Sequence, residues 1–326
     1  MGGAEDLGVF GPVADDLAAV EVSLRRLIEV DPDVVSSPMA DLFAAGGKRI
    51  RPGLVLLAAK SGRYELDTVT PAAIAVELTH AATLVHDDVI DRAAVRRGRP
   101  TVAASLGDEP AIVVGDFYFA KAYEQAARTD SPEAVAILAQ TVMRICAGEV
   151  RQQGIRLQYS TGIDEYMQRI EAKTATLLAA CCDIGALLGG VGGTKRAALR
   201  AYGRHLGLAF QIADDVLDYV GSEEEIGKPI GHDVAEGFAT LPLMLALDEA
   251  SVSNGLKRVL RDGHVLTKEE AAQVVELVRS SHGPQKALQR AEAVATLARR
   301  QLSVVDGGDA ADALAALTSY VVSRKL

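Results

Sequence analysis

The sequence contains no tryptophan, and only 4% of its residues are aromatic although 49% are hydrophobic. A core with so few rings is filled by aliphatic side chains, which is typical of packed helices. Cysteine is also rare: of the three cysteines, Cys181 and Cys182 are adjacent. This number and spacing exclude a disulfide framework and indicate a reducing compartment, so we expect a cytoplasmic protein.

Basic residues are fewer than acidic ones, with 34 Lys and Arg against 44 Asp and Glu and a net charge of −10. Such a chain is not expected to bind nucleic acid or an anionic membrane surface as its main partner. We expect no secretory signal, because the N-terminal residues include Glu5 and Asp6 and lack a basic region followed by an apolar stretch.

The stretch that comes nearest to a membrane span runs from Thr174 to Gly193. It contains Asp183 and ends in glycines, whereas a spanning helix needs about 20 predominantly apolar residues. We therefore predict a buried helix at this place and no transmembrane segment in the chain.

Helix-start signals recur along the sequence, whereas the alternation expected of strands does not. Thr70-Pro71 and Ser131-Pro132 each place a cap residue before a first-turn proline, and Thr267-x-x-Glu270 has the spacing of a capping box. No stretch is rich enough in Pro, Gly or Ser to divide the chain. We predict an all-α fold, with a single domain over residues 1–326 built as one large bundle of about ten or more helices.

Two copies of one acidic pattern, residues 87–91 (DDVID) and 214–218 (DDVLD), each end an apolar run of helical character. On a helix, residues four apart lie on one face, so Asp87 and Asp91 point the same way with Asp88 beside them. Carboxylates this close raise one another's pKa unless hard cations lie between them. Mg²⁺ suits such a site because it binds a few carboxylate oxygens and completes its shell with water and substrate phosphates.

A single pattern of this kind in an acidic chain is more often a solvated helix end than a site. Here the pattern occurs twice, and both preceding runs are apolar. This favours a functional pair of clusters that grip one diphosphate through shared metal ions. The helix dipole adds to the need for cations, because a helix C-terminus repels anions.

Basic residues gather at two places where an anionic ligand would need them. Lys48, Arg49 and Arg51 follow a glycine pair, and Arg96 and Arg97 follow the first acidic pattern by a few residues. In a chain this acidic, such clusters indicate a specific anion site rather than a solvated basic face.

Five motifs, in this order and spacing, carry a resemblance to a known family: GGKRIRP, ELTHAATLVHDDVID with RRGRPT, EAKTA, FQIADDVLD and GKPIGHD. From about residue 40 to the C-terminus, the chain resembles the all-trans polyprenyl diphosphate synthases, in particular their long-chain, hexa- to decaprenyl members. The resemblance implies a helical bundle of the isoprenoid synthase type with a central active-site cavity.

The resemblance also implies a reaction. Mg²⁺ assists the ionisation of an allylic diphosphate to a carbocation, and about three Mg²⁺ ions are expected per active site. The double bond of isopentenyl diphosphate attacks the carbocation, and the leaving diphosphate takes the proton. Family members pair through long helices, so we expect a homodimer.

Site residues follow from the resemblance, motif by motif. The expected metal ligands are Asp87, Asp88, Asp91, Asp214, Asp215 and Asp218. The expected isopentenyl diphosphate site consists of Lys48, Arg51, His80 and Arg97. The expected contacts to the allylic diphosphate are Arg96, Lys173, Thr174, Gln211 and Lys228. The expected catalytic residues are Asp87, Asp88, Asp91, Lys173, Asp214 and Asp215. His80 by itself resembles a core histidine, and only its place in the motif gives it a role.

One segment departs from the family pattern. After the second acidic pattern the family often has a lysine in a segment of the form acidic-Gly-Lys-x-Thr, but this chain has Phe238 in the segment from Glu236 to Thr240. Phe238 cannot supply charge to the allylic diphosphate. Either Lys228 and Lys173 suffice for binding, or the affinity for that substrate is reduced.

Product length is a steric question at the helix that carries the first acidic pattern. The positions one, two and three turns before Asp87 include the expected chain-length residues Val76, Thr79, Ala82 and Thr83. None is aromatic, whereas short-chain family members place a ring at or next to the position of Ala82. The sequence favours a tunnel open for roughly 15 Å and a product of six or more isoprene units (C30 or longer).

Several alternatives remain at this point. The rings of Phe117, Tyr118 and Phe119 could form a floor and limit the product to C15–C25, or they could pack in the core. A class I terpene cyclase would normally replace the second acidic pattern. A non-catalytic partner subunit would usually lose one pattern, and a structural Ca²⁺-stabilised bundle would leave the basic clusters unexplained.

We predict that Asp87→Ala or Asp214→Ala removes most of the activity without unfolding the protein, because each substitution removes a carboxylate assigned to metal binding. Turnover measured with Mg²⁺ and both diphosphates, alongside circular dichroism of each variant, tests this. Near-normal turnover in either variant would contradict the metal assignment.

Overall fold

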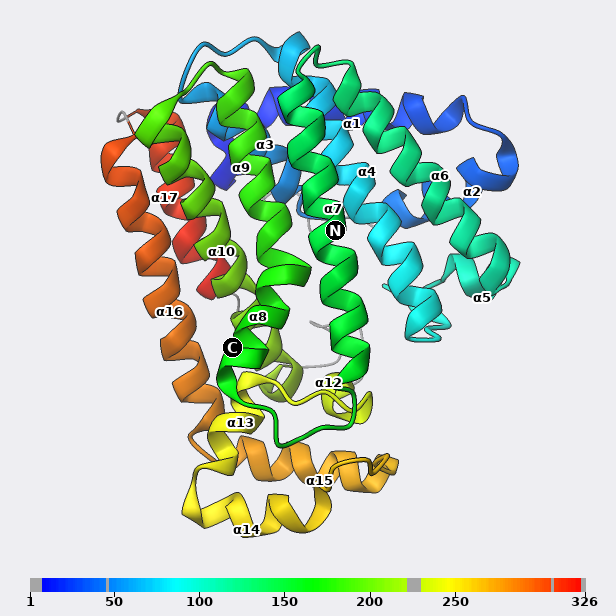
Figure 1. The fold of residues 1–326 in the computed structure, drawn as a ribbon, viewed down its shortest axis with the longest axis vertical. Coiled ribbons are helices and arrows are strands. Elements are labelled where there is room, and N and C mark those ends of the chain that lie inside the picture. The colour runs from blue at the N-terminus through cyan, green and yellow to red at the C-terminus, as the bar shows by residue number, and fades with distance from the viewer. Residues whose placement is uncertain (1–7, 45–46, 222–229, 306–307, 324–326) are drawn as a thin grey trace. The chain divides into compact units, whose positions relative to one another are not determined.

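The computed structural model describes residues 8–44, 47–221, 230–305 and 308–323 (Figure 1). Within these ranges the chain is helical except for connections and one small antiparallel hairpin. The predicted all-α fold is confirmed. The chain forms two compact units, and the single domain over residues 1–326 stays a prediction. Unit 1 comprises Met1–Val142, Leu177–Gly203 and Gln301–Leu317, and unit 2 comprises Met143–Thr176, Arg204–Arg300 and Thr318–Leu326.

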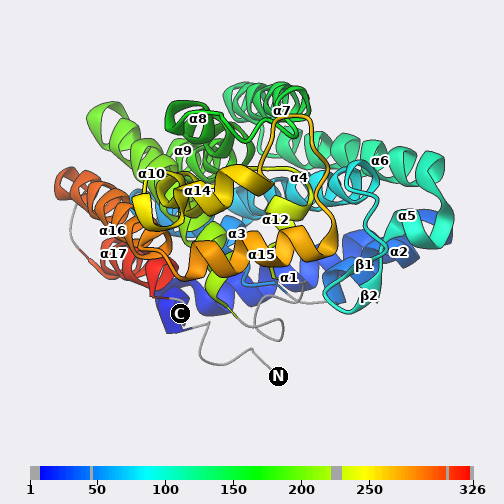
Figure 2. The same ribbon diagram turned by 90° about the horizontal axis from the view of Figure 1, so that it is seen from below.

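Unit 1 centres on α4, which packs along α6 and α3 (Figures 1 and 2). The helices α1 and α2 contact each other, and α1 also contacts α3 and α4. The elements wholly or mainly in unit 1 are η1 (Gly8–Val13), α1 (Ala14–Glu29), α2 (Asp33–Ala44), α3 (Ile50–Lys60), α4 (Leu66–Ile90), β1 (Val95–Arg96), β2 (Arg99–Pro100), α5 (Val102–Leu106), α6 (Asp108–Ala127), α9 (Thr176–Leu188), η3 (Leu302–Val304) and α17 (Asp309–Val322).

Unit 2 has its own core, in which Ile212 and Tyr219 of α10 lie in one buried cluster with Tyr166, Leu241 and Val274. The helices α13, α14 and α15 pack against one another in this unit (Figure 1). The elements wholly or mainly in unit 2 are α7 (Pro132–Gly154), α8 (Ile163–Ile170), the π-helical turn η2 (Glu171–Ala175), α10 (Gly193–Val220), α12 (His232–Ala235), α13 (Leu241–Leu247), α14 (Ala250–Val259), α15 (Lys268–Arg279) and α16 (Gly283–Gln301); the first parts of α7 and α10 belong to unit 1.

Two of the three helix starts agree with the sequence signals. The Ser131 hydroxyl accepts a hydrogen bond from the Ala134 amide before α7, and Thr267 and Glu270 form a reciprocal capping box before α15. The start predicted at Thr70-Pro71 was wrong, because α4 begins four residues earlier at Leu66. The Thr70 hydroxyl donates to the Leu66 carbonyl instead of capping, and the earlier turn of helix buries Val69.

The helix predicted in the stretch from Thr174 to Gly193 is confirmed as α9, which buries Cys181, Cys182 and Asp183. All three cysteines of the chain are free. Among the described helices, α4 alone is long and apolar enough to cross a membrane, judged by length and composition only. The protein itself buries 67% of its most apolar stretch, and buried core helices pass the same test.

The sequence shows no strand alternation, but the structure forms a small hairpin near Gly98. The strands β1 and β2 pair with Val95 opposite Pro100 and Arg96 opposite Arg99. The two turn residues, Arg97 and Gly98, have φ angles of 51° and 75°. Positive φ at both positions is the conformation of a type I′ turn, whose twist matches that of the paired strands.

Close helix packing in unit 1 depends on Gly185 in α9 and on Gly189 directly after it. A Cβ atom on Gly185 would lie 2.2 Å from the Val55 carbonyl oxygen of α3, and one on Gly189 would lie 2.4 Å from the Ala59 carbonyl oxygen. Neither contact can be relieved by rotating a side chain, because the opposing atoms belong to the backbone. The two glycines therefore set how closely α3 and α9 approach.

We predict that Gly185→Ala lowers the free energy of unfolding by about 1–3 kcal/mol, because the added methyl group overpacks the contact between α3 and α9. Gly192→Ala is the matched control, since a Cβ there meets nothing within 4 Å. The control is expected to be neutral or to stabilise by about 0.4–1 kcal/mol. Urea denaturation of both variants measures the difference, and equal midpoints would contradict the packing argument.

Candidate active site

The first acidic pattern occupies the last turn of α4, as the sequence predicted. Its middle carboxylate, Asp88, is only 2% exposed, and Arg96 Nε donates a hydrogen bond of 2.8 Å to its Oδ1 atom. Burial raises the pKa of Asp88, and the Arg96 guanidinium opposes that rise. Asp87 and Asp91 are half-buried. The three carboxylates therefore differ, with Asp88 held by a protein cation and its two neighbours nearer the surface.

The hairpin β1–β2 brings Arg96 to Asp88. The Ala93 amide donates to the Asp88 carbonyl, and the Thr101 hydroxyl donates to the Ala93 carbonyl, so both ends of the hairpin are tied to the end of α4. A small hollow, partly open to solvent, lies beside this ion pair; its lining is Pro38, Asp41, Leu42, Val85, Asp88, Arg96, Arg99, Pro100, Thr101 and Val102.

The predicted isopentenyl diphosphate residues in unit 1 share one cationic environment. Burial lowers the pKa of His80 well below its usual value, and Arg51, Arg97 and Arg96 lower it further, so the ring is neutral at pH 7. Burial also lowers the pKa of Arg51, and Arg97 adds to this effect. This field favours a bound anion, as the sequence predicted. Lys48 lies exposed at the start of the same segment.

One acidic residue stands within this cluster, and sequence reasoning missed it. Glu77 of α4 is only 5% exposed, and Arg49 Nη1 lies 2.9 Å from its Oε1 atom. Burial lowers the pKa of both Arg51 and Arg97, and the Glu77 charge opposes that lowering. A single carboxylate in an apolar helical run was the available signal, because a charge is buried at such a position only with a partner.

The second acidic pattern lies in the last two turns of α10 in unit 2. Asp215 is 3% exposed; its Oδ2 accepts a hydrogen bond of 2.8 Å from the Tyr166 hydroxyl and its Oδ1 one of 2.7 Å from Gln211 Nε2. Burial, with a smaller contribution from Asp233, raises the pKa of Asp215 to about 8. Sequence reasoning missed Tyr166, whose position on α8 gives no polar signal.

The remaining carboxylates of this pattern are placed differently. Asp218 is 1% exposed, and its Oδ2 accepts a hydrogen bond of 3.1 Å from the Asp233 amide, whereas Asp214 is half-buried. The Gly231 amide donates to the Asp218 carbonyl, which ties the GKPIGHD motif to the end of α10. Lys228 of that motif lies outside the described residues.

Lys173 and Thr174 lie on the π-helical turn η2, a local widening of the helix that is often found at functional sites. The Thr174 hydroxyl donates to Gln211 Oε1 at 2.7 Å, and Lys173 Nζ lies 2.9 Å from Glu149 Oε2. Thr174, Gln211 and Asp215 thus form a continuous hydrogen-bonded chain that ends on the acidic pattern.

Phe238, which stands where the resemblance led us to expect a lysine, packs against a cation from α8. The Arg169 guanidinium lies 5.6 Å from the centroid of the Phe238 ring and 5.5 Å from that of Tyr166. Arg169 Nη2 also donates to the Ala239 carbonyl at 2.8 Å. The Arg169 charge lowers the pKa of Asp215, so positive charge reaches this region from α8.

The predicted chain-length residues lie on α4 and differ in burial. Val76, Thr79 and Ala82 are fully buried, and Thr83 is half-buried. Of the three rings on α6, Tyr118 is directed at Asp31 and the Val35 carbonyl, to both of which its hydroxyl donates, and Phe117 lies near Lys121.

Phe119 lies beside His86, the residue that directly precedes the first acidic pattern. Its centroid lies 5.6 Å from that of His86, which is one turn beyond Ala82 and Thr83 on α4. His86 Nε2 lies 3.0 Å from the Ile112 carbonyl, and a Cβ on Gly115 would lie 2.1 Å from the same nitrogen. Gly115 therefore lets α6 accept the His86 ring.

The donor set suits a hard divalent cation, because both patterns offer only carboxylate oxygens. Within the described residues, no group of three or more His, Cys, Asp or Glu side chains is gathered closely enough to hold a metal ion. Mg²⁺ is usually held by one or two carboxylates together with substrate phosphates, so one or two carboxylates from each pattern are sufficient. The first pattern lies in unit 1 and the second in unit 2, and their meeting around one diphosphate stays a prediction.

Comparison with known proteins agrees with these motifs. The sequence profile of the family described as Polyprenyl synthetase matches residues 32–278. The chain is 41% identical over 251 residues to heptaprenyl diphosphate synthase component 2 of Geobacillus stearothermophilus, covering 77% of this chain and 78% of that protein. It is 37% identical over 326 residues to the short chain isoprenyl diphosphate synthase of Methanothermobacter thermautotrophicus, covering 97% of each.

A solved structure shares the fold. The polyprenyl synthase from Caulobacter crescentus CB15, complexed with calcium and isoprenyl diphosphate, superposes with a TM-score of 0.91 at 36% identity, covering 98% of this chain and 97% of that one. That protein binds a divalent cation together with a diphosphate.

We predict that Tyr166→Phe weakens divalent-metal binding about tenfold, because a hydrogen bond that favours the charged form of Asp215 is lost. Titration with Mn²⁺ in the presence of pyrophosphate, followed by electron paramagnetic resonance, measures the binding. Tyr159→Phe is the matched control, since that hydroxyl donates to the His264 carbonyl in the same unit. Equal Mn²⁺ affinity in the two variants would refute the role of Tyr166.

Proposed function

The chain belongs to the polyprenyl synthetase family and is a prenyltransferase, and we propose that it condenses isopentenyl diphosphate with an allylic diphosphate to make a polyprenyl diphosphate of at least six isoprene units. The observation that carries this proposal is that α4 holds both the first carboxylate pattern and His80, on which the charges of Arg51, Arg97 and Arg96 converge. The arginines suit a diphosphate bound without metal, and the carboxylates suit one bound through metal.

In the proposed reaction, Lys48, Arg51 and Arg97 bind the diphosphate of isopentenyl diphosphate. Arg51 and Arg97 supply a planar fork of donors that matches phosphate oxygens. His80 contributes a neutral ring, because burial and the neighbouring arginines keep its pKa low. A neutral imidazole still donates one hydrogen bond to a phosphate oxygen and adds no repulsion to the arginine cluster.

The allylic diphosphate is assigned to the acidic patterns. Bound Mg²⁺ supplies positive charge to the leaving diphosphate, which lowers the barrier to ionisation. Asp87, Asp91 and Asp214, which lie nearer the surface than the other three carboxylates, are the proposed direct ligands. Asp88, Asp215 and Asp218 are placed behind them by Arg96, by Tyr166 and Gln211, and by the Asp233 amide.

The remaining polar groups orient the leaving diphosphate. The oxygens of that diphosphate act as the base. The proposed contacts to the allylic diphosphate are Arg96, Lys173, Thr174, Gln211 and Lys228, as the motifs imply. His80 is a poor base because its pKa lies well below the usual value. We therefore assign the final proton of the condensation to a diphosphate oxygen and not to a side chain.

A long product is supported by the absence of rings at Val76, Thr79, Ala82 and Thr83. Of the α6 rings that could close the path, Tyr118 is turned toward α2 and Phe119 lies near the end of α4 that carries the acidic pattern. The named relatives include both a heptaprenyl and a short-chain synthase, so the family alone does not select the product.

We propose that the active form is a homodimer, with Mg²⁺ as its metal. The alternative is suggested by the relative from Geobacillus stearothermophilus, which is named as component 2 of its synthase. Activity of the purified chain by itself, together with its mass by light scattering, distinguishes the two. An inactive chain that gains activity from a second kind of subunit would overturn the homodimer.

The product distribution tests the proposed function. Purified protein is incubated with Mg²⁺, labelled isopentenyl diphosphate and farnesyl or geranylgeranyl diphosphate, and the dephosphorylated products are separated by chromatography. We expect a ladder that ends at C30 or longer. A stop between C15 and C25 would contradict the long product, and no elongation would favour the cyclase or partner-subunit alternatives.

A variant sharpens this test. Thr83→Phe places a ring one turn before Asp87 at a half-buried position, and we expect it to shorten the ladder by at least one isoprene unit. Thr83→Val is the control, because it removes the hydroxyl that donates to the His80 carbonyl without adding volume. A ladder shortened equally by both variants would show that the ring is not the cause.

A further inference from the structure

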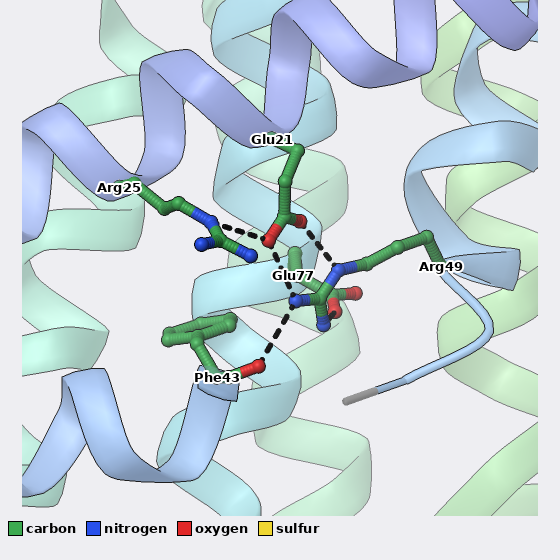
Figure 3. Close-up of polar contacts among 5 residues, drawn as sticks. All are labelled: Glu21, Arg25, Phe43, Arg49 and Glu77. Carbon is green, nitrogen blue, oxygen red and sulfur yellow. Dashed lines mark hydrogen bonds and ion pairs between the residues drawn. The ribbon is translucent and has the colours of Figure 1, made fainter. Parts of the chain in front are cut away.

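Arg49 lies between two proposed substrate ligands, Lys48 and Arg51, yet its side chain is directed into the protein. Its Nε atom lies 2.6 Å from Glu21 Oε2 and its Nη2 atom 3.1 Å from Glu21 Oε1, which makes a bidentate pair (Figure 3). Its Nη1 atom lies 2.9 Å from Glu77 Oε1. A planar guanidinium with five donors is the one side chain that can serve two carboxylates in this way.

This arrangement, which we call the Arg49 clamp, consists of Glu21, Arg49 and Glu77 and joins three elements of unit 1. Glu21 lies on α1, Glu77 lies on α4, and Arg49 immediately precedes α3. The Phe43 carbonyl near the end of α2 lies 3.5 Å from Arg49 Nη2, and the Arg49 guanidinium lies 5.3 Å from the Phe43 ring centroid (Figure 3). The clamp therefore fixes the entry to α3 from several sides.

The backbone at Arg49 needs such support. Arg49 has φ 47° and ψ 34°, a left-handed conformation that is strained for a non-glycine residue. A Cβ on Gly47 would lie 3.0 Å from Arg49 Nη1 and 3.6 Å from Arg97 Nη1, so the segment folds back over two guanidinium groups. The side-chain contacts of Arg49 stabilise this backbone conformation, which leaves Lys48 exposed to solvent and lets α3 begin at Ile50.

The clamp also balances charge beside the substrate ligands. Arg51 Nε and Glu77 Oε2 are both buried and find no hydrogen-bond partner among the described residues. Glu77 nevertheless favours the charged form of Arg51, and Arg97 opposes it. One buried carboxylate thus lets three arginines share a small volume before any anion arrives.

We propose that Glu21 and Arg49 are positioning residues that hold Lys48 and Arg51 in the geometry that binds the diphosphate of isopentenyl diphosphate. This inference rests on the proposed function for the identity of the ligand. It adds a part of the chain that the family profile does not match, since Glu21 precedes residue 32. Neither Glu21 nor Arg49 contacts the substrate in this assignment, and both act through the backbone of residues 47–51.

The test compares Glu21→Gln, Arg49→Lys and the control Arg25→Gln. Glu21→Gln keeps the shape but loses the charge, and Arg49→Lys keeps the charge but cannot bridge two carboxylates. Arg25 donates to the same Glu21 carboxylate from an exposed position, its side chain being 61% exposed, so its removal leaves the clamp in place. Thermal melts establish that each variant is folded.

Steady-state kinetics supply the first measurement. We expect Glu21→Gln and Arg49→Lys each to raise the KM for isopentenyl diphosphate about tenfold or more, while the KM for the allylic diphosphate changes less than about twofold. The double variant is expected to be little worse than either single one, because both substitutions remove the same ion pair between Glu21 and Arg49. Equal changes in the two KM values, or none, would overturn the proposal.

A binding measurement separates this inference from the proposed function. Inorganic pyrophosphate is titrated calorimetrically into the protein in the presence of EDTA, which excludes metal-dependent sites. We expect Glu21→Gln and Arg49→Lys to weaken this binding about tenfold and Arg25→Gln to leave it unchanged. Unchanged binding in all three would overturn the clamp, whereas an inactive wild-type protein with the expected binding would overturn only the proposed reaction.

Discussion

Like charges crowd together at each functional segment of this chain, and the local structure depends on how each group is balanced from within. Asp88 is balanced by Arg96, and the arginines near His80 are balanced by Glu77. Asp215 has no cation at hydrogen-bond distance among the described residues and instead receives neutral donors from Tyr166 and Gln211. Burial makes each of these contacts strong, because a charge removed from water is stable only beside a matching group.

These internal partners also explain why the carboxylates of one motif are not equivalent. A buried carboxylate that already accepts hydrogen bonds from protein groups is held in place, and it has less capacity left for a metal ion. Its less buried neighbours keep their oxygens closer to the surface. The same division holds in both patterns, with Asp88 behind Asp87 and Asp215 behind Asp214. In each pattern, the buried carboxylate therefore has a fixed orientation, and the less buried one remains accessible to a metal ion.

Much of this could be predicted from the sequence. The helical fold, the acidic patterns at helix ends and the basic cluster around Arg51 follow from periodicity and residue type, which act locally, whereas the role expected of His80 came from its place in a family motif. Tyr166 could not be found in this way, because its role depends on a contact with Asp215, 49 positions away. Glu77 gave a local signal as a carboxylate in an apolar run, but its partner Arg49 lies 28 positions away and could not be named. The hairpin near Gly98 was missed because two-residue strands have no periodicity to detect.

The start of α4 shows the opposite failure, in which a strong local signal was overruled. Thr70-Pro71 has the chemistry of a helix start, but the additional turn before it buries Val69, and this burial outweighs the hydrogen bond that proline cannot make. Product length belongs with these non-local properties. The relatives named above include a short chain and a heptaprenyl synthase, so membership of the family does not select the product, and we propose that the packing beside α4 does.

The π-helical turn at Glu171–Ala175 has a consequence for how this segment can change in evolution. Tyr166 and Thr174 are eight residues apart, and eight steps of a regular α-helix would leave them roughly 80° apart around the axis. The widened turn absorbs about one residue, which brings both side chains to the face that meets α10. Deleting one residue from the widened turn would leave a regular α-helix with the two positions seven residues apart and about 20° from one face, whereas a second deletion would swing Thr174 by about 100° and break its link to Gln211. We therefore expect this stretch to tolerate the loss of one residue better than the loss of two.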